Sequence, residues 1–154
     1  MKKSLAGILL AFGILTLVPA APKAAPVGPA LGIRAGFSRN PDQFVIGAQA
    51  ELGKLGLATI APSIDLGLGD GSDVTAANLD LRWYLFPLPQ TGIHFYAATG
   101  PTAVFVNSES DVGLSLTAGA KIPMKGKWRY NLEARFGIGD IPDLKVMLGI
   151  LFGI

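Results

Sequence analysis

Ten charged side chains recur at alternate positions inside apolar segments of this chain. In the segment Trp128–Ile138, charged or amide residues occupy one set of alternate positions and apolar residues occupy the other. Six of the ten are cations and four are anions: Arg34, Glu51, Asp65, Asp80, Arg82, Lys121, Arg129, Glu133, Arg135 and Lys145. If these side chains are enclosed together they must pair, because an unpaired buried charge is far more costly. We therefore expect an internal salt-bridge network, with a pore lining or a ligand site as the alternative.

The single histidine, His94, is the candidate for acid–base chemistry. A catalytic histidine needs a serine or a carboxylate within reach, and no motif around His94 supplies one. We predict a structural hydrogen bond for His94, no catalytic residues and no enzymatic activity. A lipid-modifying barrel enzyme that depends on His94 is the alternative.

Two short motifs resemble ion-binding or phosphate-binding loops but lack essential parts. Asp70-Gly-Ser-Asp73 has neither the spacing nor the bidentate glutamate of an EF-hand, so we predict a solvated turn. Gly67-Leu-Gly-Asp-Gly71 lacks the Lys-Ser/Thr and the helix of a phosphate loop. The 154 residues include no cysteine, and the net charge is only +2. We expect no metal site, no cofactor and no nucleic-acid partner.

The first 25 residues have the pattern of a secretory signal peptide. Lys2 and Lys3 give a basic start, Leu5–Val18 is an apolar run of 14 residues, and small residues follow. A membrane-anchor helix is the alternative, but the run is short for a spanning helix. We assign residues 1–25 to a cleaved leader and residues 26–154 to one domain.

The charged residues of this domain lie in segments with a period of two, which predicts β-strands. Leu144–Ile154 shows one wholly apolar face and one face of mixed residues. Eight such segments follow one another: Ala30–Ser38, Gln43–Gly53, Leu57–Leu68, Thr75–Phe86, Gly92–Val106, Val112–Ile122, Trp128–Ile138 and Leu144–Ile154. Pro62 and Pro101 fall inside strands, where proline cannot donate to a ladder, so we expect a bulge or a strand end at each.

The apolar face of these strands carries no charge, and its most polar member is Thr99. A charge at the middle of a membrane would cost about 2–4 kcal/mol, which gives this sorting a physical cause. The pattern predicts an all-β fold, an eight-stranded antiparallel up-and-down transmembrane β-barrel with a polar interior. An eight-stranded barrel is just wide enough for its side chains to fill it.

Aromatic residues and turn charges also divide between the two ends of the predicted barrel. Alternate loops carry acids, such as Asp42 and Asp143, whereas the other turns carry Lys54, Lys125 and Lys127 and no acid. We expect the acidic loops outside the cell and the basic turns in the periplasm. Two aromatic belts typical of membrane interfaces are predicted, one near the basic end and one near the acidic end. Their members are Trp83, Phe86, Phe95, Trp128, Tyr130 and Phe152, and then Phe37, Phe44, Phe105 and Phe136.

Over residues 30–154 the chain resembles the small eight-stranded outer-membrane β-barrels of the OmpA/OmpX-like superfamily. Four phrases carry the resemblance: Asn78-Leu-Asp-Leu-Arg-Trp-Tyr-Leu-Phe-Pro87, Ile93-His-Phe-Tyr-Ala-Ala-Thr-Gly100, Tyr130-Asn-Leu-Glu-Ala-Arg-Phe136 and the closing strand Leu148-Gly-Ile-Leu-Phe-Gly-Ile154. The resemblance implies residence in the outer membrane of a Gram-negative bacterium. It also implies contact with outer-membrane lipids, lipopolysaccharide and the assembly machinery.

From these observations we expect a monomeric barrel with a structural or interaction role and a filled polar interior. A narrow channel for small solutes is the first alternative, since inward glycines could leave gaps: Gly32, Gly36, Gly47, Gly67, Gly100, Gly113 and Gly119. A soluble, ligand-enclosing barrel like a lipocalin is a further alternative. It conflicts with the sorting, because its apolar face would lie in water.

Overall fold

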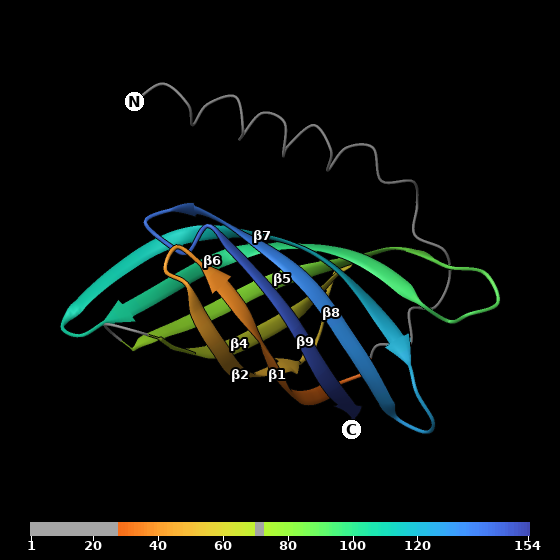
Figure 1. Ribbon diagram of the computed structural model, residues 1–154. Coiled ribbons are helices and arrows are strands. Elements are labelled where there is room, and N and C mark those ends of the chain that lie inside the picture. Colours follow the sequence, from red (N-terminus) through yellow and green to blue (C-terminus); the bar gives the residue numbers. More distant parts are fainter. Residues whose placement is uncertain (1–27, 70–72) are drawn as a thin grey trace.

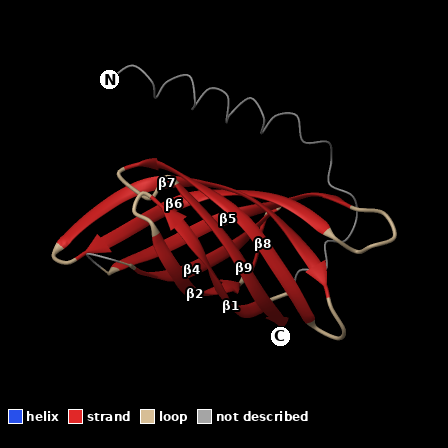
Figure 2. Ribbon diagram, in the orientation of Figure 1, coloured by secondary structure: helices blue, strands red, loops and turns tan. Residues whose placement is uncertain are grey.

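The computed structural model describes residues 28–69 and 73–154, and in this part of the chain every regular element is a strand (Figures 1 and 2). The predicted leader, residues 1–25, lies outside the described residues. Among the described residues, no helix has the length and apolar character needed to cross a membrane. The strands are β1 (Ala30–Arg39), β2 (Gln43–Glu51), β3 (Gly53–Leu55), β4 (Ala58–Leu68), β5 (Val74–Pro87), β6 (His94–Val106), β7 (Glu109–Pro123), β8 (Trp128–Gly139) and β9 (Leu144–Gly153).

The strands close into a barrel through antiparallel pairs. Apart from β2 and β3, strands that follow one another in the chain pair with each other, and β1 pairs with β9, which joins the last strand to the first. β2 pairs with β4, and the short β3 continues the line of β2 along the same partner. Eight wall strands therefore form a closed ring, and the predicted eight-stranded up-and-down barrel is confirmed. In Figure 1 the strands run obliquely around the wall, as closure of a sheet requires.

The two ends of the barrel are named here by their connections. At the terminal end, β1 begins at Ala30 and β9 ends at Gly153. At the loop end, β1 and β9 meet at the pair of Arg39 and Leu144. The turns that join β1 to β2, β4 to β5, β6 to β7 and β8 to β9 all lie at the loop end.

The strand formed by β2 and β3 contains a β-bulge. From Gln49 to Gly53 the chain advances four residues, while the partner β4 advances three, from Ser63 to Ile60. The Leu52 N–H donates to the Ile60 carbonyl at 3.0 Å, and Gly53 is also paired with Ile60, so the extra residue lies opposite Ile60. A bulge thus lies close to Pro62, as expected, but it is in the partner strand and two residues away along β4.

Pro101 does not interrupt β6, and the prediction of a bulge or strand end there is wrong. β6 continues through Pro101 and keeps its register with β7. On the other side, the ladder with β5 has a gap between the pairs Asn78–Thr102 and Leu81–Thr99, without a change of register. A gap in one ladder is enough to accommodate the proline, because only one N–H is missing.

A second irregularity lies near the terminal end of β5. The register with β6 shifts between Tyr84 and Phe86, so that Leu85 is an extra residue. Strict alternation would turn the Phe86 side chain inward, but after the shift it is exposed and its ring lies 5.2 Å from that of Phe95. The bulge thus moves an aromatic ring to the outer surface.

The turn between β6 and β7 is shorter than predicted. The predicted strands Gly92–Val106 and Val112–Ile122 leave Asn107–Asp111 as the connection, but the observed connection consists of Asn107 and Ser108, and β7 begins at Glu109. Asn107 adopts a φ of 54°, a conformation that asparagine tolerates better than most residues. The polar residues before Val112 belong to β7. The prediction, which relied on composition, therefore placed the start of this strand too late in the chain.

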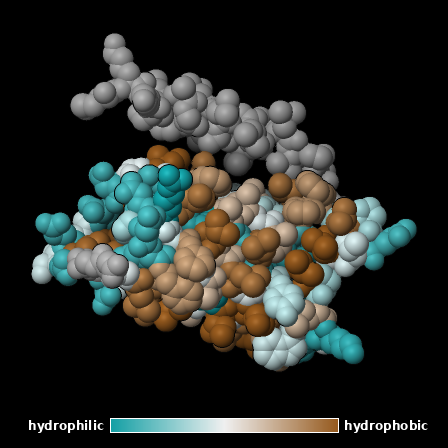
Figure 3. Space-filling model, viewed as in Figure 1, coloured by the Kyte–Doolittle hydropathy of each residue, from teal (hydrophilic) through white to brown (hydrophobic). Residues whose placement is uncertain are grey.

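The wall separates an apolar outer surface from a polar interior. Outward side chains such as Ile33 and Leu148 are 70% and 54% exposed, while charged side chains of the same strands are buried. Figure 3 shows apolar residues over the middle of the wall and hydrophilic residues gathered at its two ends. Of the charged residues in strands, those that are exposed lie at or near strand ends: Arg39, Lys54, Glu109 and Asp111.

Candidate functional site

The interior of the barrel holds nine of the ten charged residues predicted to form a network. Seven of the eight wall strands contribute at least one of them. Each of the nine is buried and takes part in an ion pair: Arg34, Glu51, Asp65, Asp80, Arg82, Lys121, Glu133, Arg135 and Lys145. The tenth, Arg129, is half-buried near the start of β8.

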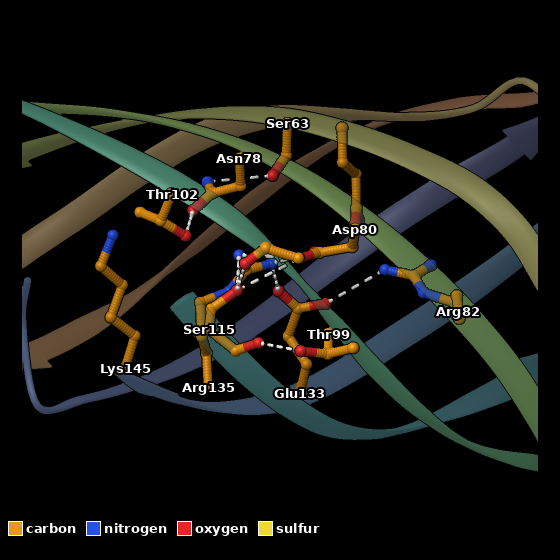
Figure 4. A network of polar contacts seen from close by, with 12 residues as sticks. Ser63, Asn78, Asp80, Arg82, Thr99, Thr102, Ser115, Glu133, Arg135 and Lys145 are labelled. Carbon is orange, nitrogen blue, oxygen red and sulfur yellow. Dashed lines mark hydrogen bonds and ion pairs between the residues drawn. The ribbon is translucent and has the colours of Figure 1, made fainter. Parts of the chain in front are cut away.

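Glu133 of β8 occupies the centre of the network (Figure 4). Its Oε1 lies 2.5 Å from Nη1 of Arg34 and 3.6 Å from Nη2 of Arg135. Its Oε2 lies 3.5 Å from Nη2 of Arg82 and accepts a hydrogen bond of 3.0 Å from the Tyr96 hydroxyl. One carboxylate therefore joins three guanidinium groups from three strands, β1, β5 and β8.

Towards the loop end, two further carboxylates continue the network. Asp65 lies 2.6 Å from the Arg34 guanidinium and 3.4 Å from the Lys145 ammonium. Asp80 binds Arg135 through Oδ2 and Nη2 at 2.5 Å. Because these partners come from β1, β4, β5, β8 and β9, the ion pairs connect opposite parts of the wall.

Towards the terminal end, Glu51 of β2 is the acceptor for two cations. It pairs with Arg82 at 2.5 Å and with Lys121, and it accepts a hydrogen bond of 3.0 Å from the Tyr84 hydroxyl. The Lys121 ammonium lies 4.9 Å from the centre of the Tyr84 ring, and the Arg82 guanidinium lies 4.3 Å from that of Tyr96. Aromatic faces thus supply a second stabilising contact for both cations.

Neutral polar side chains complete the network, and these were not predicted as members of it. Tyr96 donates to Asn131 at 2.8 Å, Arg34 donates to Ser63 at 2.8 Å, and Thr102 donates to Asn78 at 2.9 Å. All of them occupy the same alternate positions as the charges. The period of two was therefore a sufficient signal to find them, but their partners depend on how the barrel closes.

The inward glycines are closely surrounded by neighbouring atoms. A Cβ atom at Gly119 would lie 2.3 Å from the Tyr96 ring, and one at Gly67 would lie 2.2 Å from the Gln43 side chain. A Cβ atom at Gly32 or Gly36 would lie 2.1 or 1.9 Å from a backbone carbonyl oxygen of β9. A Cβ atom at Gly47, Gly100 or Gly113 would also lie too close to a neighbouring atom, at 2.5, 1.9 and 2.6 Å respectively. These glycines permit close packing of strands and of large interior side chains.

The loop end is closed by apolar side chains from the β8–β9 connection, which was expected to be an acidic outer loop. Ile141 is 7% exposed and packs in a cluster with Val74, Ala76 and Val104. Pro142 is also buried, and only the flanking acids face outward. We call the hollow of about 590 Å³ at this end the acidic mouth; its lining includes Val74, Val104 and Ile141 of this cluster together with Asp111, Asp140 and Asp143.

The terminal end holds a smaller hollow with the opposite charge. We call it the basic mouth; it has a volume of about 250 Å³ and is lined by Tyr84, Gly92, His94, Lys121, Pro123, Gly126, Lys127, Trp128 and Arg129. His94 Nδ1 lies 2.8 Å from the carbonyl oxygen of Gly92, which fits a donated hydrogen bond. The lining gives His94 neither a serine nor a carboxylate, so the contact supports the predicted structural role.

The predicted aromatic belts lie on the outer surface. Eight of the ten side chains are exposed, and Trp83 and Phe95 are half-buried. Two ring pairs mark the ends, Trp128–Phe152 at the terminal end with centroids 4.9 Å apart and Phe37–Phe44 at the loop end at 5.5 Å. Thr99, the most polar outward residue, satisfies its hydroxyl by donating to the Ser115 carbonyl at 2.9 Å.

Within residues 28–69 and 73–154, no group of three or more histidine, cysteine, aspartate or glutamate residues has the arrangement of a metal site. The Asp70–Asp73 motif lies largely outside the described residues, so its predicted solvated turn is untested.

The fold matches those of small membrane barrels. No protein-family profile matches the sequence, and no curated protein matches it either. The N-terminal β-barrel domain of Pseudomonas aeruginosa OprF superposes with a TM-score of 0.63 at 17% identity, covering 80% of this chain and 96% of that domain. Neisserial surface protein A superposes with a TM-score of 0.64 at 9% sequence identity, covering 82% of this chain and 96% of that protein chain. A transmembrane β-barrel made by de novo design superposes with a TM-score of 0.61 at 10% sequence identity, covering 86% of this chain and 100% of the designed chain. At these identities the likeness shows the fold, and the predicted resemblance to small eight-stranded outer-membrane barrels is confirmed at that level.

Proposed function

We propose that this protein is an outer-membrane β-barrel with a filled lumen and a structural or interaction role. The observation that carries the proposal is the sorting of charge across the wall. Nine charged side chains are buried inside, whereas the outer face between the strand ends is apolar. A charge at the membrane midplane costs about 2–4 kcal/mol. If lipid surrounds the outer face, this cost explains why charged side chains are confined to the interior and to the two ends of the barrel.

The same sorting argues against a soluble ligand-enclosing barrel. Outward leucines, isoleucines and phenylalanines are roughly half exposed on every side of the barrel, for example Leu79, Leu114 and Phe136. A continuous apolar surface of this extent in water would promote aggregation. In a bilayer the same surface is solvated by acyl chains.

The packed interior argues against a channel. The Arg82, Tyr96, Met147, Glu133 and Asn131 side chains are all completely buried within the lumen. The space above the inward glycines is taken up by neighbouring strands or by such side chains. A solute would have to displace ion pairs, and breaking a buried pair is strongly unfavourable.

Catalysis has little support from the arrangement around His94. Its ring nitrogen Nδ1 is held by the Gly92 carbonyl, and the described lining of the basic mouth includes neither a serine nor a carboxylate. A catalytic histidine needs such a partner within reach. We propose no enzymatic role; an unchanged lipid A mass spectrum after deletion of the gene is the expected result.

The partners that fit the outer face are outer-membrane lipids, including lipopolysaccharide, and the assembly machinery that inserts such barrels. The wall is closed, and among the described strands only the three-residue β3 (Gly53–Leu55) pairs on one side alone, which is too short an edge to template pairing with a second copy. We propose a monomer on this basis.

Heat-modifiability in outer membranes tests the proposal. The precursor is expressed in a Gram-negative host, and the outer-membrane fraction is run on gels with and without boiling. We expect a faster-migrating unboiled band in that fraction. A soluble periplasmic product without a mobility shift would overturn the proposal.

A matched pair of variants separates a lipid-facing surface from an ordinary protein surface. Leu148→Lys places a charge in the middle of β9 on the outer face, where Leu148 is 54% exposed. Leu57→Lys makes the same change in a turn, at a side chain that is 85% exposed. In lipid the first variant should lose about 2–4 kcal/mol of stability and the second almost none. Equal, small effects would mean that the outer face is in water.

A further inference from the structure

The basic mouth concentrates positive charge in a small hollow. Its lining includes the residues Lys121, Lys127 and Arg129 together with His94. None of the described residues that line it is an acid. A hollow of about 250 Å³ whose described lining contains three basic residues and no carboxylate is suited to an anionic group.

The polar residues of the lining come from three neighbouring strands or their connections. His94 of β6 lies directly opposite Lys121 of β7, and Lys121 in turn pairs in register with Asn131 of β8. Arg129 precedes Asn131 by two residues and therefore projects from the same face of β8. Lys127 belongs to the turn before β8. Donors on adjacent strands can reach different oxygens of one tetrahedral anion.

Lys121 is held in place but retains the capacity to bind a ligand. Its side chain is 3% exposed, with Glu51 on one side and the Tyr84 ring 4.9 Å away. An ammonium group has three N–H donors, and Glu51 Oε1 accepts one of them. Glu51 is also shared with Arg82, so one carboxylate serves two cations at this end of the lumen.

The hollow lies at the level of the aromatic ring pair on the outer wall. Trp128 belongs to its lining, and on the outer surface the same ring packs against Phe152 at 4.9 Å. Exposed tryptophans favour the depth of lipid headgroups. An anion bound here would therefore lie where the phosphates of a bilayer leaflet lie.

We propose that the basic mouth is a binding site for a phosphate group, supplied either by a phospholipid headgroup or by a free phosphate. The headgroup source rests on the membrane location proposed above, whereas binding of free phosphate does not. The acidic mouth serves as an internal contrast, because Asp111, Asp140 and Asp143 at its rim repel anions.

Fluorescence titration of the folded full chain in uncharged maltoside micelles tests the site. The chain has two tryptophans, so Trp83→Phe leaves Trp128 as the reporter in the lining. The titrants are inorganic phosphate, dihexanoylphosphatidylglycerol and, for ionic strength, sodium chloride. We expect a saturable change in Trp128 emission with at least one phosphate compound and not with chloride.

Two double variants in this background remove equal charge inside and outside the lining. Lys127→Gln with Arg129→Gln should weaken phosphate binding by about tenfold or more, since two charge-assisted contacts are lost. Lys54→Gln with Lys125→Gln removes two exposed lysines that do not line the hollow, and should change affinity by less than about twofold. If the first pair prevents folding, Lys127→Gln alone, at an exposed turn position, is compared with Lys125→Gln.

Each outcome decides the proposal. Tighter binding of phosphatidylglycerol than of inorganic phosphate supports the headgroup source, and equal or tighter binding of inorganic phosphate supports the free ion. Equal weakening by both double variants, or a response that chloride reproduces, overturns the site. Heat-modifiable migration of the same preparations reports on the barrel separately, so failure of the site is distinguishable from failure of the proposed function.

Discussion

The two ends of the lumen are closed in different ways. At the acidic mouth, Ile141 and Pro142 fold inward and cover an apolar cluster around Val74 and Val104. At the basic mouth, closure depends on Glu51 and the cations that share it, and a charged hollow is left. Apolar contacts are non-directional and tolerate repacking, whereas buried ion pairs require partners at fixed positions.

This difference assigns separate roles to the two halves of the interior. The ion pairs join β1, β2, β4, β5, β7, β8 and β9, so they favour the one register in which every charge finds a partner. The apolar plug involves one connection and a few side chains. Loss of the ion pairs should therefore lower the stability of the whole barrel. Loss of the apolar plug should lower mainly the stability of the loop end.

Loss of the central carboxylate should have the largest effect. Glu133→Gln removes the charge that faces Arg34, Arg82 and Arg135, and we expect a loss of about 3–5 kcal/mol in the free energy of unfolding. Urea unfolding in lipid vesicles, followed by tryptophan fluorescence, measures it. Glu109→Gln, at an exposed position, should change stability by less than about 0.5 kcal/mol. A similar, small loss in both variants would refute the role of the network.

Truncation of the apolar plug should have a smaller effect. Ile141→Ala removes a buried side chain from the cluster at the acidic mouth, and we expect a loss of about 2–4 kcal/mol in the same unfolding experiment. Leu57→Ala is the control, since Leu57 is 85% exposed in a turn at the terminal end. If Ile141→Ala is as mild as this control, the loop does not seal the loop end.

Filling a glycine tests whether the lumen has spare room. A methyl group at Gly119 would lie 2.3 Å from the Tyr96 ring, so Gly119→Ala should cost about 1–3 kcal/mol through overpacking. Gly28→Ala is the matched change, because a Cβ atom there meets nothing within 4 Å. A neutral or stabilising Gly119→Ala would show that the interior beside Tyr96 contains usable space.

The sequence predicted the architecture well because the period of two and the position of charge are local properties. The eight wall strands and the inward face of residues such as Glu133 and Lys145 followed directly from alternation. Two bulges, near Leu52 and at Leu85, were not located in this way, apart from the signal of Pro62. A bulge depends on the partner strand, which the pattern of a single strand does not describe.

The partners within the site could not be predicted from the pattern. Asp65 and Lys145 are 80 residues apart, and they meet because the stagger of the strands brings them to one level of the lumen. Ile141 was expected in an exposed acidic loop, but the apolar cluster below it stabilises its burial. Arg129 has the predicted alternation but is only half-buried, because it stands near the start of β8.

The most direct test of the filled lumen is the electrical conductance of the purified protein in a planar lipid bilayer. We predict insertion without stable unitary current steps, because ion pairs and large side chains occupy the lumen from the basic mouth to the apolar plug. Incorporation is verified by heat-modifiable migration of protein recovered from vesicles of the same lipid. Regular, reproducible current steps from the unaltered protein would contradict the account and favour a narrow channel.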